Sequence, residues 1–257
     1  MLENNNIITD ENYYQDREYI SASMVKQALQ GSKKQFDYAM NNSLETEAML
    51  VGSAFHSMIL EPEKFESEYA FEPAMDRRTK AGKEYIEEWK KQNENIPNHI
   101  PGKHEQRLLD MKDSLMMHNT FKSMLDPDGE FEQIKLFELN GVKCKAKVDY
   151  YNPKDNYILD IKTCSSVQID DIVESIRKYS YGIQAAFYLD GLKAHKFYFA
   201  FIDKNSPHDV VIVDFIAGLQ DGRKAYEAGI SNIQAFAKME EEGIGPGYSM
   251  FNKIIRM

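Results

Sequence analysis

Alternating hydrophobic and polar positions in the second half of the chain predict a β-sheet. Segment 131–139 (FEQIKLFEL) alternates, and the Asn-Gly pair that follows it is typical of a hairpin turn into the next strand. Five segments carry a strand pattern: 131–139, 142–151, the segment around Asp160, 196–202 and 209–215. The expected sheet therefore consists of three consecutive strands and a later pair.

Helical periodicity dominates the first half of the chain and recurs between and after the strands. Six helices are expected: from a cap at Ser21 or Ser23 to about residue 38, then 47–60, 79–93, 103–125, 168–193 and 219–242. Segment 62–76 shows neither pattern and is expected to be irregular. Helices followed by three strands, a helix and two strands are typical of an α/β core with a mixed sheet.

The pattern also divides the chain. Residues 1–19 are polar and acidic, and we expect them to be loosely ordered. Residues 20–257 are expected to form a single domain, with a mainly helical part at 20–125 and an α/β core at 126–257.

Composition restricts the compartment and the cofactor. No apolar run approaches the length of about 18 residues that a membrane-spanning helix needs. The amino terminus lacks the basic and apolar regions of a secretory signal, so we expect a cytoplasmic protein without a membrane partner. Its two cysteines, Cys144 and Cys164, cannot supply the four ligands of an iron–sulfur cluster, and none is expected.

The formal net charge of −10 would disfavour nucleic acid if it were spread evenly, because basic residues supply most non-specific affinity for phosphate. The basic residues are gathered locally instead. One group alternates along the strand that carries Asp149, on the same face, and consists of Lys143, Lys145 and Lys147. A second group consists of Arg77, Arg78, Lys80 and Lys83. A solvated surface is the ordinary explanation for such groups, but we expect the second group, with Lys145 and Lys147 of the first, to contact DNA.

Two carboxylates and a lysine converge at the end of one predicted hairpin. Asp149 lies on its first strand, and Asp160 and Lys162 lie on the second. Alternate side chains share a face of a strand, so Asp160 and Lys162 point the same way while their apolar neighbours point into a core. Paired carboxylates hold a hard divalent cation such as Mg²⁺, and a lysine beside it can orient water and neutralise charge on a phosphate. A surface hairpin with ordinary charges is the alternative, but unpaired polar groups on so apolar a strand would be costly.

These residues resemble the signature of the PD-(D/E)xK nucleases. Asp149 and the run Asp160-Ile161-Lys162 match it, although Val148 stands where proline is usual. Gln184 and Tyr188 resemble the QxxxY motif of the RecB-type branch. Further segments resemble the phage-type RecE-like exodeoxyribonucleases: Gly52–His56 with Leu60–Glu63, Arg78–Lys83, and Tyr181–Tyr188. The resemblance extends from about residue 20 to about residue 215.

The resemblance implies a restriction-endonuclease-like core, in which helices flank a mixed central sheet, preceded by a helical N-terminal portion. It also implies a metal site made of His56, Asp149, Asp160 and the carbonyl of Ile161. Without the resemblance, a lone histidine on the apolar helix 47–60 would more often be a packed core residue. The expected metal is Mg²⁺, and Mn²⁺, which suits imidazole better, is expected to substitute for it.

Other residues are assigned to the catalytic site by the same resemblance. Glu132 resembles an acidic residue that relatives place beside the metal, and Glu138 is its competitor. Gln184 and Tyr188 are expected beside the active site, although a packed Tyr188 and an exposed Gln184 would explain them as well. Tyr181 is expected to touch DNA, and simple packing is the alternative.

The implied activity is digestion of one strand of linear double-stranded DNA, from 5′ to 3′, which leaves a 3′ single strand. The resemblance further implies a single-strand annealing protein of the RecT type as partner, a ring of three or four subunits, and a phage or prophage origin. Two alternatives stay open at this point: a structure-specific or restriction-type endonuclease on the same core, and a non-catalytic DNA-binding module.

Overall fold

The computed structural model describes residues 8–42, 46–76 and 78–243. Its centre is a six-stranded sheet with the order β1, β5, β6, β7, β8, in which β4 pairs with β5. The strands are β1 (Ile20–Ser21), β4 (Glu130–Leu139), β5 (Val142–Asn152), β6 (Tyr157–Cys164), β7 (Lys196–Asp203) and β8 (Val210–Asp214). The pairs β1–β5 and β6–β7 are parallel and the other pairs are antiparallel. The expected mixed α/β sheet is therefore confirmed.

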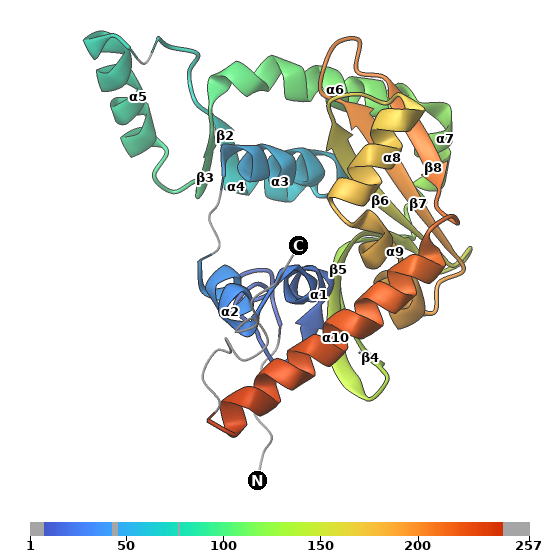
Figure 1. The fold of residues 1–257 in the computed structure, drawn as a ribbon. Helices are drawn as coiled ribbons and strands as arrows, with labels where there is room; N and C mark the ends of the chain where they lie inside the picture. The colour runs from blue at the N-terminus through green and yellow to red at the C-terminus, as the bar shows by residue number, and fades with distance from the viewer. Residues whose placement is uncertain (1–7, 43–45, 77, 244–257) are drawn as a thin grey trace, which may run out of the picture.

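Helices cover both faces of this sheet (Figure 1). One buried cluster joins one face to α1 (Ala22–Gln30), α8 (Ile169–Lys178), α9 (Tyr181–Leu192) and α10 (Leu219–Glu241). A second cluster joins the opposite face to α3 (Glu47–Leu60), α6 (Glu105–Met117) and α7 (Asn119–Met124). Strand β6 contributes to both, since Ile158 belongs to the first cluster while Leu159 and Ile161 belong to the second.

The strands β5 and β6 are paired only where their hairpin closes. Their ladder joins residues 150–152 to 157–159, while β4 follows the other edge of β5 along its length. β1 occupies the same edge of β5 as β6, but only further along, at residues 144–145. Within the described residues, the part of β5 in between has no strand partner on that edge. There the carbonyl of Lys147 accepts a hydrogen bond from the Tyr188 hydroxyl, at 3.1 Å.

Several expected elements are divided or extended. The first helix ends at a break, and α2 (Lys33–Asn41) starts anew because Ser32 and Gln35 form a capping box. The helix expected at 168–193 is interrupted at Ser180, which has a positive φ of 52°. The helix expected at 103–125 is divided between α6 and α7, and the side chain of His118 caps α7.

The segment expected to be irregular contains regular structure. It holds α4 (Pro62–Glu68) and β2 (Tyr69–Phe71), and β2 pairs in parallel with β3 (Asn98–Ile100). Helix α5 (Lys80–Gln92) lies between these two strands in the chain. In Figure 1 it stands apart from the main sheet, at the upper left of the view.

The polar N-terminal segment, which we expected to be loose, is anchored to β5 at Tyr13 and Asp16; residues 1–7 lie outside the described residues. Its Tyr13 is buried against β5. The ammonium of Lys145, which is 1% exposed, donates hydrogen bonds to the carbonyl of Tyr13 at 2.6 Å and to the carbonyl and carboxylate of Asp16. A contact with DNA is therefore the wrong prediction for Lys145, because the segment covers it.

We predict that Lys145→Ala lowers the free energy of unfolding by about 3 kcal/mol, since it removes one partner of a buried ion pair. Urea unfolding followed by circular dichroism measures the change. The matched control is Lys143→Ala on the same strand face, whose side chain is 59% exposed and pairs with Glu18. Its cost should stay below about 1 kcal/mol. Equal losses in the two variants would contradict the anchoring role of Lys145.

Candidate active site

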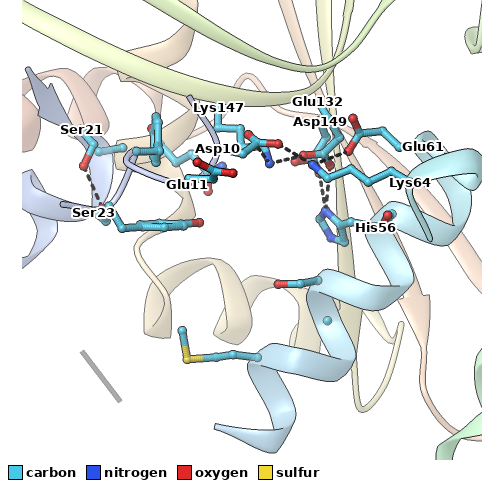
Figure 2. Close-up of a pocket in the computed structure, with 18 of the residues that line it drawn as sticks. Asp10, Glu11, Ser21, Ser23, His56, Glu61, Lys64, Glu132, Lys147 and Asp149 are labelled. Atoms are coloured by element: carbon cyan, nitrogen blue, oxygen red, sulfur yellow. Dashed lines mark hydrogen bonds and ion pairs between the residues drawn. The ribbon is translucent and has the colours of Figure 1, made fainter. Parts of the chain in front are cut away.

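Three side chains from three elements meet beside the gap between β5 and β6. They are His56 of α3, Glu132 of β4 and Asp149 of β5, and one ligand atom of each lies within 4.8 Å of the others. The Nδ1 atom of His56 lies 3.3 Å from Asp149 Oδ2 and 3.8 Å from Glu132 Oε1. Figure 2 shows the imidazole reaching from α3 towards the two carboxylates.

The strand register explains why the two carboxylates meet. Residue 131 faces residue 150 and residue 133 faces residue 148, so Glu132 lies opposite Asp149. Directly opposed residues on antiparallel strands place their side chains on one face. Glu132 also has a positive φ of 48°, which costs on the order of 1 kcal/mol for a residue other than glycine. Backbone strain of this kind is typical of functional sites, where the surrounding structure maintains it.

Asp149 connects the separated strands. Its Oδ2 atom accepts a hydrogen bond from the backbone N–H of Ile161, at 2.8 Å. The carboxylate thus satisfies a donor of β6 at the point where β5 no longer pairs with it. This bond also fixes the orientation of the carboxylate towards His56.

Asp160 and Lys162 lie on the neighbouring strand and form a pair of their own. The Lys162 ammonium is 2.6 Å from Asp160 Oδ2, and Gln184 of α9 donates a hydrogen bond to Asp160 Oδ1 at 2.6 Å. Gln184 therefore orients the carboxylate of Asp160, and the hydroxyl of Tyr188 one turn later donates a hydrogen bond to the carbonyl of Lys147. Asp160 is buried and directed towards these partners, outside the three-residue cluster.

The electrostatics of the site follow from its burial and from the crowding of carboxylates. Burial alone would lower the pKa of His56, but Asp149 and Glu132 outweigh it and raise the pKa to about 10. Burial, with help from Asp149, raises the pKa of Asp160 to about 6 although Lys162 opposes the rise. Burial would lower the pKa of Lys162 as well, but Asp160 and Asp149 hold it above its usual value. His56 and Lys162 are therefore both cationic at neutral pH in the metal-free protein.

The cluster fits a divalent cation. Glu132 Oε1 is buried and accepts no hydrogen bond from the described residues, so this oxygen is available to bind an ion. Two carboxylates are typical ligands of Mg²⁺, and an added imidazole suits Mn²⁺. Asp160 and the carbonyl of Ile161 remain predicted ligands of the metal. In the structure, Asp149 contacts the N–H of Ile161 and not its carbonyl.

A cavity of about 650 Å³ opens onto the cluster (Figure 2). It is lined on one side by His56, Glu132 and Asp149, and on another by the N-terminal segment and the start of α1. Sequence reasoning missed five of its charged residues: Asp10, Glu11, Lys26, Lys64 and Glu68. For Lys64, the sequence offered one signal of a place in the site: it directly follows the Leu60–Glu63 segment. Burial and the nearby Lys162 lower the pKa of Lys26 to about 8.

The residues expected to bind DNA lie in different places. Lys147 is at the cluster, 3.2 Å from Glu132 Oε2. Tyr181 packs in the first core cluster with the Lys162 ammonium 5.0 Å from its ring centroid, and it stacks on Tyr179. Arg78, Lys80 and Lys83 are exposed on or next to α5, which stands apart from the sheet, so the structure does not bring them to the cluster. Arg77 lies outside the described residues.

We predict that metal-free protein loses stability as pH rises from about 6.5 to about 10 because of His56. Its pKa is raised on folding, so its contribution is complete below the unfolded pKa and is lost as pH rises through the folded pKa of about 10. Urea unfolding at several pH values in the presence of EDTA measures the slope.

His56→Gln should flatten this slope, and the exposed His195→Gln is the control for loss of an imidazole. An unchanged slope in His56→Gln would remove the charged histidine from the cluster.

Comparison with solved structures supports the fold. No helix in the described residues has the length and apolarity needed to cross a membrane. No curated protein matches the chain. A crystal structure of a candidate exonuclease from Eubacterium rectale has the same fold, with 20% identity, a TM-score of 0.66, and coverage of 98% of this chain and 95% of that one. A phage-related exonuclease from Haemophilus somnus 129PT is 15% identical with a TM-score of 0.41, over 89% of this chain and 97% of that one.

The sequence profile of one protein family matches residues 21–249, which is most of the chain. Its description, "PDDEXK-like domain of unknown function (DUF3799)", agrees with the Asp149, Asp160 and Lys162 signature and with the mixed sheet that carries it. The chain therefore belongs to this family of PDDEXK-like domains and has the PD-(D/E)xK nuclease fold.

Proposed function

We propose that the chain is a metal-dependent exodeoxyribonuclease that degrades one strand of linear double-stranded DNA, from 5′ to 3′, and leaves a 3′ single strand. The observation that carries the proposal is the meeting of His56, Glu132 and Asp149 beside the pair Asp160–Lys162. Membership of a nuclease-like family supports hydrolysis of a phosphodiester. Strand choice and polarity rest on the resemblance to RecE-like exonucleases.

The metal would be held by His56, Glu132 and Asp149, with Asp160 and the carbonyl of Ile161 as further ligands. We expect Mg²⁺, with Mn²⁺ as a substitute. Such an ion supplies a Lewis acid for the phosphate and lowers the pKa of bound water. In the metal-free protein the charged His56 stabilises the two carboxylates instead, so binding of the ion has to displace its proton.

The remaining residues position the reacting groups. Lys162, held as an ammonium by Asp160, can donate hydrogen bonds to the attacking water and to a non-bridging oxygen of the phosphate. Gln184 fixes the carboxylate of Asp160, and Tyr188 fixes the backbone of β5 at Lys147. Lys147 and Tyr181, beside these groups, are proposed DNA contacts. An acidic surface elsewhere would restrict DNA to this cavity.

The proposal extends to partners. We propose a ring of three or four subunits, because an enclosed duplex would let one enzyme make many cuts before release, and a RecT-type annealing protein that receives the single strand. Light scattering should then give a mass three or four times 29.7 kDa. A monomer that also releases DNA after each cut would contradict the ring.

An endonuclease on the same core and a non-catalytic DNA-binding module are the competing functions. The exonuclease should shorten 5′- or 3′-labelled linear duplex from one end in Mg²⁺ and should leave closed circular plasmid intact. Nicking or linearisation of the plasmid would favour the endonuclease. Absence of any cleavage with Mg²⁺ or Mn²⁺, despite binding, would favour the module.

We predict that Asp160→Asn lowers the rate of DNA degradation by about 10²-fold or more, since it removes a negative charge next to the proposed metal and next to Lys162. The asparagine carbonyl can still accept the bond from Gln184, so the fold should persist. The matched control is Asp155→Asn, an exposed residue in the same hairpin, which should keep the parental rate. A parental rate in Asp160→Asn would exclude Asp160 from the chemistry.

A further inference from the structure

The carboxylate of Asp10 lies between two lysines at the edge of the cavity (Figure 2). Its Oδ1 atom is 3.0 Å from the Lys147 ammonium, and its Oδ2 atom accepts a hydrogen bond from Lys64 of α4. Lys147 also pairs with Glu132, a member of the metal cluster. One carboxylate thus connects the N-terminal segment to the mouth of the proposed active site.

In the described part of the chain, the N-terminal segment that carries Asp10 is fixed to the sheet only on the C-terminal side of this residue. The segment is anchored to β5 at Tyr13 and Asp16 through the buried Lys145, whereas Asp10 lies outside that anchor. Its side chain is 40% exposed, and those of Lys64 and Lys147 are 26% and 24% exposed. The carboxylate is the most exposed of the three groups, so water can replace its lysine partners and the contact can open while the anchor at Lys145 holds.

The two lysines around Asp10 would also suit a phosphodiester group. Both a carboxylate and a phosphodiester carry one negative charge shared by two outer oxygens, and lysines bind either group as point charges. Asp10 therefore occupies two lysines that a phosphate could bind; Lys64 also lies 3.3 Å from Glu61, and Lys147 lies 3.2 Å from Glu132. The cluster next to it already contains Glu132 and Asp149, so an extra carboxylate there opposes the approach of a polyanion.

We propose that Lys64 and Lys147 form a subsite for a backbone phosphate of the substrate next to the cleavage site, and that Asp10 occupies this subsite in the DNA-free protein. The proposal rests on the proposed function insofar as the phosphate belongs to DNA. The N-terminal segment then acts as a reversible gate, because DNA binding must exchange the Asp10 carboxylate for a phosphate. A purely structural role for Asp10 would instead be to hold the segment in place.

The gate and the purely structural role of Asp10 predict different effects of Asp10→Asn on DNA binding. Affinity for a linear duplex is measured by fluorescence anisotropy with Ca²⁺ in place of Mg²⁺ to limit cleavage. Asp10→Asn should tighten binding by about 3- to 10-fold, and Lys64→Gln should weaken it about 5-fold and reduce the slope of affinity against salt by about one charge. Glu11→Gln is the matched control for loss of a carboxylate from the same cavity, because Glu11 forms no ion pair with the described residues, and it should tighten binding by less than 2-fold.

A double variant tests whether the two residues act through each other. In the Lys64→Gln background, Asp10→Asn should bring less than half of its gain, because half of the subsite is already missing. Urea unfolding of each variant verifies that the fold is retained. Unchanged or weaker DNA binding by a folded Asp10→Asn would overturn the gate, and unchanged binding by Lys64→Gln would overturn the subsite.

A second probe keeps the inference separate from the proposed function. Inorganic phosphate should raise the melting temperature of Asp10→Asn more than that of the parent, and adding Lys64→Gln should abolish the difference. If this holds while the parent neither binds nor degrades DNA, the subsite stands and the proposed function fails. If the parent degrades DNA but the substitutions at Asp10 and Lys64 change neither phosphate binding nor DNA binding, the proposed subsite is wrong while the proposed function stands.

Discussion

The site depends on the separation of β5 from β6 directly after their hairpin. Backbone donors and acceptors left without a strand partner inside a protein must find other partners. Here side chains provide them: Asp149 accepts the N–H of Ile161, and Tyr188 donates to the carbonyl of Lys147. Asp149, fixed in this way, meets Glu132 of the paired strand β4 and the imidazole of His56 from α3.

Charge compensation keeps such a site folded in the absence of an ion. His56 lies as a cation between Asp149 and Glu132, and Lys162 compensates Asp160. A divalent ion would replace the proton of His56 and leave the rest of the arrangement in place. Charge compensation continues at Lys147, whose ammonium pairs with both Glu132 and Asp10. The protein thus maintains local neutrality with groups that metal and DNA can displace.

Much of the fold follows from local patterns. Strands β4 to β8 and helix α3 lie close to where hydrophobic periodicity predicted them, and the sheet is mixed as expected, but the two-residue strand β1 was not predicted. The break before α2 was visible in principle, since Ser32 and Gln35 have the spacing of a capping box. The break at Ser180 was not, because a serine with positive φ is maintained by its surroundings and not by its own preference.

The sequence by itself determined most of the elements and the family signature of Asp149, Asp160 and Lys162, because these depend on neighbours within a few residues. Tertiary structure decided which residues serve the site among those that have equivalent positions in the sequence pattern. Lys145 and Lys147 share one face of β5, yet one is buried under Tyr13 and Asp16 while the other lies at the cluster with Asp10 and Glu132. Alternation along a strand assigns both the same environment. Only the path of the N-terminal segment, which meets β5 from more than a hundred positions away in the chain, distinguishes them.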